Sequence, residues 1–526
     1  MASARTPTRK ISSNSFRFRS VSILCFAFVV AVAFAWTWTL FCILRHEHEQ
    51  EKEQPQRASQ WTKVKPKPNK ASFHIVFSTG CSAFQDWQSY AFFYQIQQTL
   101  ENASASALAM QMTLDNTNVT RIASGCTAQQ ELTLRDIFNK QWGNHNTNFH
   151  LHFTPDYSRI LPNEKYHFFN KPHGLKHWFD HGLLFDHPKT SFQRQRKLEE
   201  TIFILLDPDQ LMLRPFMQDY SQDRFVVWSE PDQIIHKAVE HGKPMAQLYM
   251  FGTSWRKKIN MTEILLTSGL ATPQTVSSMP SGVWNWTNKE VFHYYRPGPP
   301  YIATGRDMFQ IATAWSQFVL PVYRQTKDHL SEMFAYSVAA AHLQLRHQLV
   351  KSLMVSNADV DEEGWPLIDA LDASRVCDTT VSQQRLPEVL HYCQGYALEE
   401  FFFSKYSLPK EFLSCNHALL KVPPPFDNKK PAPFYTEEVG SGTWPGGKTR
   451  NFTKIKRQRH AFMTCQMLHR LNQAATVYKK RHCSMNTGNY DYLGGDKETV
   501  TANFDETFIW PHLQNSSKSP ATVSVR

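Results

Sequence analysis

The sequence predicts an α/β protein built on a doubly wound sheet. Short, wholly apolar runs such as residues 201–206 (TIFILL) are typical of parallel strands that are covered on both faces. Segments with helical spacing alternate with these runs along the chain, which favours strand–helix units. Apolar residues make up 41% of the 526 residues and aromatic residues 13%. This composition excludes a mostly disordered chain and supports a large core.

The elements follow one another in a simple order, with no internal repeat. Strands are expected where a short apolar run ends at a turn, and helices where apolar residues recur every three or four positions. The predicted strands are 73–79, 119–123, 201–206 and 389–392, and the predicted helices are 86–100, 175–185, 332–345 and 461–480.

Residues 21–44 form a membrane-anchor candidate, since these 24 residues carry no charge. A spanning helix needs about 20 apolar residues, whereas the apolar part of a cleaved signal peptide usually has about 7–15. We therefore favour an uncleaved signal anchor. Five basic residues and no acid precede it, and acidic residues follow it, so the positive-inside rule places the N-terminus in the cytoplasm and everything after Arg45 in the lumen.

This anchor divides the chain into a cytoplasmic tail (1–20), a transmembrane helix (21–44), a polar stem rich in Lys and Pro (45–71), a globular domain (72–485) and a flexible C-terminal tail (486–526). Six N-x-S/T sequons agree with a lumenal body. They begin at Asn102, Asn118, Asn260, Asn285, Asn451 and Asn515.

Cysteine usage points to the same oxidising compartment, because seven of the nine cysteines lie outside the anchor. Seven is odd, so at least one does not pair within the chain. We expect Cys81 to pair with Cys126, and Cys465 with Cys483.

The net charge of +11 does not indicate a nucleic-acid-binding protein, because the positive charge is confined to two segments. Residues 1–20 hold five of the basic residues and residues 445–485 hold ten, with no acid in either segment, so the rest of the chain has a net charge of −4. Nucleic-acid readers usually spread positive charge over the folded domain. The basic segment 448–481 could bind a polyanion, but we favour a solvated basic face that lies against acidic lipid headgroups.

The strongest chemical signal is Asp207-Pro208-Asp209, directly after the 201–206 strand. Ligands of open α/β sheets bind beyond the carboxyl ends of strands. The residue before a proline favours an extended conformation, in which side chains at i and i+2 point the same way. Both carboxylates can then bind one hard cation such as Mg²⁺ or Mn²⁺. The alternative is a polar turn after a buried strand.

A second candidate lies in LHYCQGY, where His391 could supply a third metal ligand through a neutral imidazole. Lys405, which follows the apolar run FFFS, could neutralise a diphosphate. The alternatives are a hydrogen-bonded core histidine and a solvated lysine. This cluster serves the metal only if the fold brings it beside the two aspartates.

Seven blocks in one order carry a family resemblance over roughly residues 72–485. They read FSTGCSAFQDWQ (77–88), FNKPHGLKHWF (169–179), ILLDPDQLMLRP (204–215), PYIATGRDM (300–308), EMFAYS (332–337), VLHYCQGY (389–396) and FFFSKYSLPKEFLSCNHALLKVPPP (401–425). With the anchor and stem, they resemble type II Golgi glycosyltransferases of the GT-A kind, specifically the peptidyl serine α-galactosyltransferases. More distantly, they are similar to the hydroxyproline O-arabinosyltransferases.

The resemblance implies a UDP-sugar donor and an acceptor hydroxyl on a secreted, Ser- or hydroxyproline-rich polypeptide. It implies a GT-A-like fold in a single-pass protein of the Golgi membrane or endoplasmic reticulum, with the catalytic domain in the lumen. It places Mn²⁺, or Mg²⁺, on Asp207, Asp209 and His391. Transfer is expected to retain the anomeric configuration, without a fixed nucleophile.

The resemblance also suggests further site residues. Thr79 would lie near the uridine, and Asn170, Lys171 and Lys405 would contact the donor. Asp307 and Glu332 are the catalytic candidates, as carboxylates that orient a hydroxyl or stabilise positive charge at the anomeric carbon. The alternative for Glu332 is simple polarity in a first helical turn.

Two alternatives stay open. One is an arabinosyltransferase that acts on hydroxyproline. The other is a non-catalytic, sugar-binding lumenal module, against which the intact Asp207, Asp209 and His391 set argues.

Overall fold

The computed structural model describes residues 71–104, 111–143, 148–230, 236–249, 251–253, 255–278, 286–398, 401–424, 426, 453–483 and 488–491. The chain divides into two compact units, Met1–Asn69 and Lys70–Arg526, and every described residue belongs to the second. The predicted anchor at 21–44 lies outside the described residues. Within the described part of the chain, no helix is both long and apolar enough to cross a bilayer.

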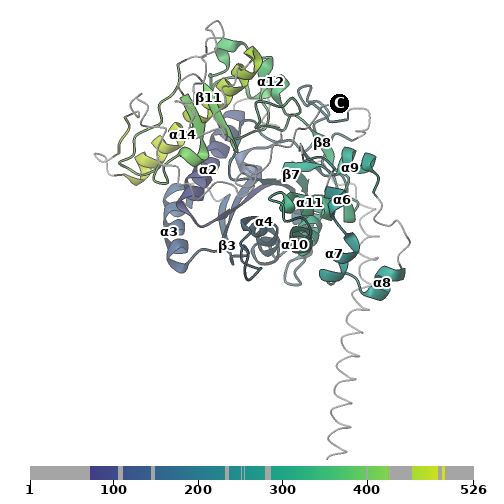
Figure 1. Cartoon of the computed structure of the whole chain (residues 1–526). Helices are drawn as coiled ribbons and strands as arrows, with labels where there is room; N and C mark the ends of the chain where they lie inside the picture. Colours follow the sequence, from purple (N-terminus) through teal and green to yellow (C-terminus); the bar gives the residue numbers. More distant parts are fainter. Residues whose placement is uncertain are drawn as a thin grey trace, which may run out of the picture. The chain divides into compact units, whose positions relative to one another are not determined.

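A seven-stranded mixed sheet forms the centre of the described unit (Figure 1). Its order across the sheet is β3 (Phe149–Thr154), β2 (Thr117–Ser124), β1 (Phe73–Gly80), β4 (Ile202–Leu206), β7 (Pro297–Thr304), β6 (Met245–Leu248) and β8 (Gln348–Val350). The first four strands run parallel, and β8 runs parallel to β6. Only β7 is antiparallel to its neighbours, β4 and β6. The carboxyl ends of β1 to β4 therefore share one edge.

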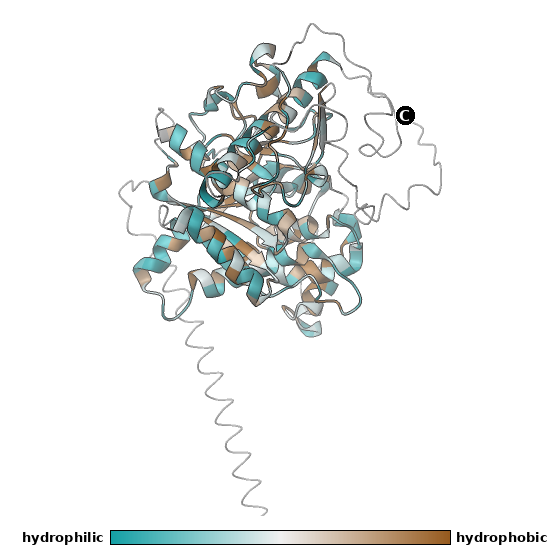
Figure 2. Cartoon of the chain, turned by 90° about the vertical axis from the view of Figure 1, so that its left-hand side faces the viewer, coloured by the Kyte–Doolittle hydropathy of each residue, from teal (hydrophilic) through white to brown (hydrophobic). Residues whose placement is uncertain are grey.

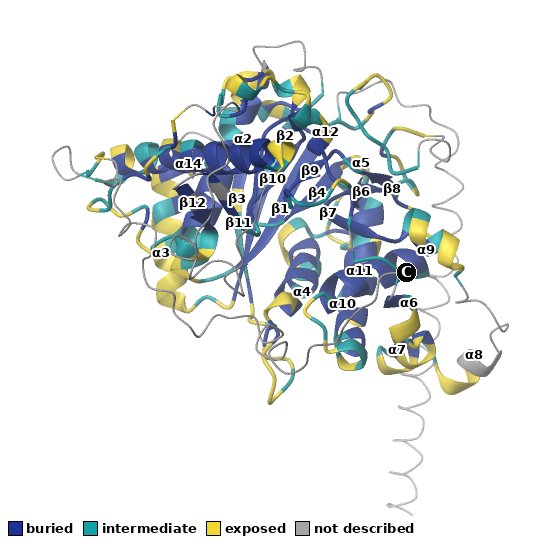
Figure 3. Ribbon diagram, turned by 45° about the horizontal axis from the view of Figure 1, so that its top comes forward, coloured by how far each residue is buried: buried dark blue, intermediate teal, exposed yellow. Residues whose placement is uncertain are grey.

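Helices cover both faces of this sheet. Figure 3 shows α2 and α14 on one side and α4, α10 and α11 on the other. The α-helices are α2 (Ala83–Ser104), α3 (Ala128–Phe138), α4 (Asn170–His177), α5 (Phe192–Glu200), α6 (Trp255–Lys258), α7 (Met261–Thr267), α8 (Pro273–Ser278), α9 (Asn288–Tyr294), α10 (Gly305–Thr326), α11 (Ser331–His342), α12 (Trp365–Asp369) and α14 (Lys454–His482). Two π-helical turns, η3 (Asn139–Gly143) and η5 (Trp178–Leu183), extend α3 and α4. The 3₁₀ turns are η2 (Leu114–Asn116), η4 (His167–Phe169), η7 (Ala373–Arg375), η8 (Gln383–Arg385) and η9 (Lys405–Ser407).

The alternation of side chains along the strands produces two apolar cores. Phe73, Ile75 and Phe77 of β1 point to the core under α2 and α14, whereas Val76 points to the core under α4, α10 and α11. In Figure 2, brown apolar residues alternate with teal hydrophilic ones along the helices that cover the sheet, as expected for helices with one apolar face. A sheet that is buried on both faces needs the continuously apolar β4 that the sequence contains.

Two smaller sheets lie beside the main one. In the first, β10 (Val389–His391) lies between β5 (Gln210–Met212) and β9 (Met354–Val355). In the second, β11 (Gly395–Leu398) and β12 (Phe401–Ser404) form an antiparallel hairpin. The strand predicted at 389–392 therefore exists, but it belongs to a separate sheet.

Most predicted elements are confirmed within a few residues. The strands at 73–79, 119–123 and 201–206 are β1, β2 and β4, and the helices at 86–100, 332–345 and 461–480 are α2, α11 and α14. The helix predicted at 175–185 begins earlier, at Asn170. Pro172 does not stop it, because proline is tolerated in the first helical turn, where its missing N–H has no partner to lose.

The prediction of a solvated basic face at 448–481 holds for only part of the described helix α14, where Lys454, Lys480 and Arg481 are exposed. Arg457, Arg459, Arg470 and Lys479 are all buried. Arg459 donates to both carboxylate oxygens of Asp369, at 2.9 and 2.7 Å. These charges hold α14 to the body of the domain.

The described cysteines form three disulfides. Cys81 pairs with Cys126 as predicted. The predicted pair Cys465–Cys483 is wrong: Cys465 pairs with Cys377, and Cys483 pairs with Cys415. Cys465 lies within α14 and Cys483 directly follows its last residue. At about 1.5 Å per residue they are about 27 Å apart, too far to bond to each other.

Candidate metal centre

The end of β4 delivers the two aspartates. Asp207 follows the buried strand, and a turn closes when the backbone N–H of Gln210 donates to the Asp207 carbonyl at 3.1 Å. The Gln210 side chain accepts from the Asp207 N–H at 2.9 Å and donates to the Pro299 carbonyl at 3.1 Å. The two carboxylates therefore converge across a tight turn at Pro208 and Asp209, and not along one continuous extended segment.

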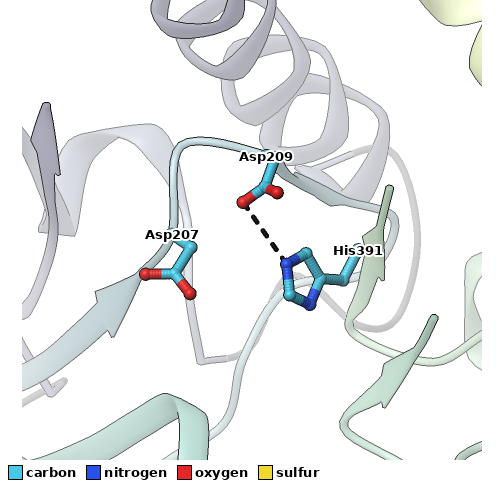
Figure 4. A group of neighbouring side chains, drawn as sticks. All are labelled: Asp207, Asp209 and His391. Atoms are coloured by element: carbon cyan, nitrogen blue, oxygen red, sulfur yellow. Dashed lines mark ion pairs between the residues drawn. The ribbon is translucent and has the colours of Figure 1, made fainter. Parts of the chain in front are cut away.

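His391 reaches the aspartates because β10 pairs with β5. In this antiparallel ladder His391 lies opposite Gln210, and the Tyr392 N–H donates to the Asp209 carbonyl at 3.0 Å. One ligand atom each from Asp207, Asp209 and His391 lies within 4.8 Å of the others. Figure 4 shows the three side chains facing one space, with His391 Nε2 3.3 Å from Asp209 Oδ1. Residues 184 positions apart thus form one cluster.

Two lysines and a glutamate complete the arrangement. Lys405 Nζ forms an ion pair with Asp209 Oδ2. Lys171 Nζ lies 2.7 Å from Asp207 Oδ1 and 3.2 Å from Glu332 Oε1. Each aspartate therefore has its own ammonium partner, and the Glu332 carboxylate joins the group through Lys171.

Burial and charge act against each other at this cluster. Burial alone would raise the pKa of Asp209, but Lys405 and His391 outweigh it and hold the pKa well below its usual range. Burial raises the pKa of Glu332 to about 7, with Lys171 opposing the shift and Asp207 adding to it. Burial lowers the pKa of Lys171, but Asp207 and Glu332 outweigh it, so the ammonium stays charged.

A buried ion network supports the strand that carries His391. Arg214 forms ion pairs with Glu388 and Asp223, and all three side chains are at most 7% exposed. The Glu388 carbonyl also accepts from the Leu213 N–H at 2.7 Å. These contacts join the end of β5 to the start of β10, and so fix the ladder that brings His391 to Asp209.

Thr79 and Asn170 make hydrogen bonds within the protein. The Thr79 hydroxyl is buried and accepts from Arg121 Nε at 2.8 Å. Asn170 accepts from the Tyr157 N–H at 2.7 Å and donates to Asp156 at 3.2 Å. The Thr79 bond thus joins β1 to β2, and the Asn170 bonds join the start of α4 to the residues after β3.

Asp307 is not brought to the cluster. Because β7 is antiparallel to β4, Thr304 at the end of β7 lies opposite Ile202 at the start of β4. Ile202 and Asp207 are about 17 Å apart along the strand. Asp307 therefore lies at the other edge of the sheet, where its carboxylate accepts from the Gly242 N–H at 2.7 Å.

The residues present fit a divalent cation. Two carboxylates and one imidazole are the oxygen-rich donors that suit Mn²⁺ or Mg²⁺. Nε2 of His391 lies 3.3 Å from Asp209 Oδ1, so an imidazole nitrogen and a carboxylate oxygen already face one space. Asp207 is the most exposed of the three, with a side chain that is 21% exposed, so a ligand has access from its side.

Sequence reasoning missed the supporting residues Gln210, Arg214 and Glu388. Gln210 directly follows the Asp-Pro-Asp motif, so the sequence could have indicated that it lies near the site. Its supporting role could not be predicted, because it depends on the pairing of β5 with β10. Arg214 and Glu388 are 174 positions apart, and no spacing rule connects them.

Comparison with known proteins adds little to this picture. The sequence matches no protein-family profile and no curated protein. Among the solved structures that it matches is the apo structure of the bifunctional glycosyltransferase WbbM, with 11% sequence identity and a TM-score of 0.29. The match covers 62% of this chain and 47% of that one, so this chain spans about half the length of that structure. A similarity at this level does not identify a function.

Proposed function

We propose that this protein is a metal-dependent glycosyltransferase that moves a sugar from a UDP-sugar to a hydroxyl group, with retention of configuration. One observation carries the proposal: Asp207, Asp209 and His391 offer ligand atoms within 4.8 Å of one another at the carboxyl edge of a parallel-rich sheet. Nucleotide-type ligands bind at this edge in open α/β folds.

The charges around the cluster support the chemistry. A divalent ion bound there would stabilise negative charge on a leaving diphosphate. Lys171 is buried and the Lys405 side chain is 12% exposed. Their ammonium groups already contact the two aspartates, so both are close enough to neutralise phosphate oxygens. Glu332 is the proposed catalytic carboxylate, and its ion pair with Lys171 at 3.2 Å supports this choice.

The donor, acceptor and compartment are proposed from the sequence. The resemblance favours a peptidyl serine α-galactosyltransferase acting on a secreted Ser- or hydroxyproline-rich polypeptide. The charge-free segment at 21–44, the sequons and the three disulfides support a type II protein in the Golgi membrane or endoplasmic reticulum, with a lumenal catalytic domain.

The first test measures UDP release from UDP-sugars by the full-length chain, with Mn²⁺ and with EDTA. We expect Mn²⁺-dependent turnover that falls at least 100-fold in Asp209→Asn. The matched control is Asp136→Asn, which removes an exposed aspartate that is also paired with a lysine, Lys140. Equal turnover in EDTA, or full turnover by Asp209→Asn, would contradict the proposal.

The second test separates the alternatives. UDP-galactose and UDP-arabinofuranose are each offered with Ser-containing and hydroxyproline-containing peptides. Galactose transfer to Ser supports the proposal, and arabinose transfer to hydroxyproline supports the related arabinosyltransferase. Metal-dependent UDP binding without transfer or hydrolysis would identify a non-catalytic sugar-binding module.

A further inference from the structure

Three histidines gather on the edge of the molecule formed by β3, the last turn of α4 and the π-turn η5. His152 stands on β3, His177 ends α4, and His181 lies in η5. His152 Nε2 and His177 Nδ1 are 2.9 Å apart. The rings of His177 and His181 have centroids 4.4 Å apart. None of these residues belongs to the candidate metal centre.

The local fold brings the histidines together. His177 and His181 are four residues apart, a spacing that places two side chains on one side of a helix, as in helical zinc sites. Gly182 lets the π-turn approach β3, since a Cβ atom there would lie 3.1 Å from His152 Nδ1 and 2.5 Å from the Trp178 ring. Single π-turns within helices occur frequently at functional sites.

We propose that His152, His177 and His181 form a second metal site, which binds a transition-metal ion such as Zn²⁺ through imidazole nitrogens. Two nitrogens that share a tetrahedral Zn²⁺ are about 3.3 Å apart, given Zn–N bonds of about 2.0–2.1 Å. The 2.9 Å separation of His152 and His177 is close to that value. Among the described residues, only Asp207, Asp209 and His391 have three ligand atoms within 4.8 Å of one another. The three histidines are not yet that close, so the His181 side chain has to rotate to complete the second site.

His181 is free to turn, because it is exposed, whereas His152 and His177 are half-buried. Burial and the neighbouring His177 and His181 lower the pKa of His152 to about 4, so its ring is neutral and able to bind metal near pH 7. Asp180, whose charge acts on His177, is paired with Lys176 at 2.6 Å.

The two sites differ in the metals that they favour. Imidazole donors suit Zn²⁺, Cu²⁺ and Ni²⁺, whereas the carboxylate-rich centre suits Mn²⁺ and Mg²⁺. Zn²⁺ at the histidine site would tie the edge strand β3 to α4, and the first turn of α4 carries Lys171. The histidine site would thus stabilise α4, which carries Lys171, although the histidines do not belong to the candidate metal centre.

The experiment uses the full-length chain without a polyhistidine tag, in an Asp209→Asn background that weakens the first site. Zn²⁺ is titrated in competition with a fluorescent chelator, and thermal unfolding is followed with and without Zn²⁺. We expect one equivalent to bind at micromolar concentration or below and to raise the unfolding temperature. His181→Ala should weaken binding at least tenfold and leave the unfolding temperature in EDTA unchanged, because this side chain is exposed.

His236→Ala is the matched control, since it removes another exposed histidine that lies outside this group. Retention of parental Zn²⁺ affinity in His181→Ala would overturn the proposal, and so would equal losses in His181→Ala and His236→Ala. His177→Ala should abolish binding. If this variant fails to fold, the His181→Ala result decides alone. None of these readouts depends on transferase activity.

Discussion

Asp209 lies between two cationic partners, the ammonium of Lys405 and the imidazole of His391. Asp207 is paired with Lys171 in the same way. If the proposed function holds, a divalent cation would compete with the lysines for these carboxylates, and the lysines would be close enough to pair with phosphate oxygens. The lysines would then oppose metal binding and favour nucleotide binding, and mutation can separate the two effects.

Lys405→Met is predicted to change the two affinities in opposite directions. Mn²⁺ should bind several-fold to tenfold more tightly, because a competing positive charge is removed from Asp209 in a site of low dielectric constant. UDP should bind more weakly in the presence of saturating Mn²⁺, because a phosphate partner is lost.

Mn²⁺ binding can be followed by electron paramagnetic resonance, and UDP binding by calorimetry. Lys140→Met is the matched control, since Lys140 is exposed and pairs with Asp136 on the surface. Weaker Mn²⁺ binding in Lys405→Met would contradict the competition.

Single residues of the site were predictable where local chemistry determines them. A carboxylate pair that directly follows a buried strand is readable from the sequence, and so is a histidine in an apolar strand. Asp307 shows the limit of this reasoning. Asp307 lies in the block 300–308 that carries part of the family resemblance, but β7 is antiparallel to β4, so Asp307 lies at the opposite edge of the sheet from the metal centre. Strand direction depends on long-range pairing, which no local pattern shows.

At the scale of elements, the β5–β10 ladder matters most, because it places His391. Its ion network has two acids and one base: Glu388 and Asp223 share Arg214. Burial raises the pKa of Glu388 to about 7, with Arg214 opposing the shift and Asp223 adding to it. One arginine thus balances only one of the two buried negative charges.

This imbalance predicts a pH dependence of stability. The pKa of Glu388 rises from 4.5 in the unfolded chain to about 7 in the fold, so the folded state holds the extra proton between these values. Its contribution to stability is complete below pH 4.5, falls as the pH rises, and is lost above pH 7. At 1.36 kcal/mol per pKa unit, the loss is about 3 kcal/mol.

Glu388→Gln removes this titration while keeping an acceptor for Arg214. Relative to the parent, the variant should therefore gain stability as the pH rises from 4.5 to 7, and then change no further. Urea unfolding of both proteins across this range, in EDTA, measures the difference. A difference that does not vary with pH would contradict the raised pKa.

Two elements, α10 and β7, were not predicted from the sequence, for different reasons. The helix α10 carries a clear helical pattern in Met308, Ile311, Trp315 and Phe318, all buried, so a closer analysis would have found it. The strand β7 begins with prolines, which normally argue against a central strand. Its pairing with β4 begins only at Tyr301, and Pro299 and Pro300 bulge out of the pairing with the adjacent β6 residues Ala246 and Gln247.

At the scale of the whole molecule, the disulfides connect segments that are distant in sequence. Cys377–Cys465 spans 88 residues and Cys415–Cys483 spans 68, and both anchor α14 to preceding segments. The helix packs against the core that contains β1 and α2. The doubly wound fold was predictable from periodicity, but these pairings were not, since they depend on which loops reach the helix.

These crosslinks make stability depend on the compartment in which the chain folds. Closing an 88-residue loop stabilises a fold by about 4–5 kcal/mol in the chain-entropy account, so Cys377→Ala with Cys465→Ala should lose an amount of this order in urea unfolding. Peptide mapping of the parent should find Cys465 joined to Cys377 and not to Cys483. As a control, Cys393→Ala should leave all three crosslinks in place, since Cys393 is free in the described structure.

The same property tests the proposed lumenal location. Chain produced in an oxidising secretory pathway should carry the three disulfides and unfold at a higher temperature than chain from a reducing cytosol. Reduction with dithiothreitol should bring the first down to the second, because loss of the covalent loops increases the entropy of the unfolded state. Equal stability of the oxidised and reduced chains would mean that the disulfides do not stabilise the fold, and the argument from cysteine usage to a lumenal protein would fail with them.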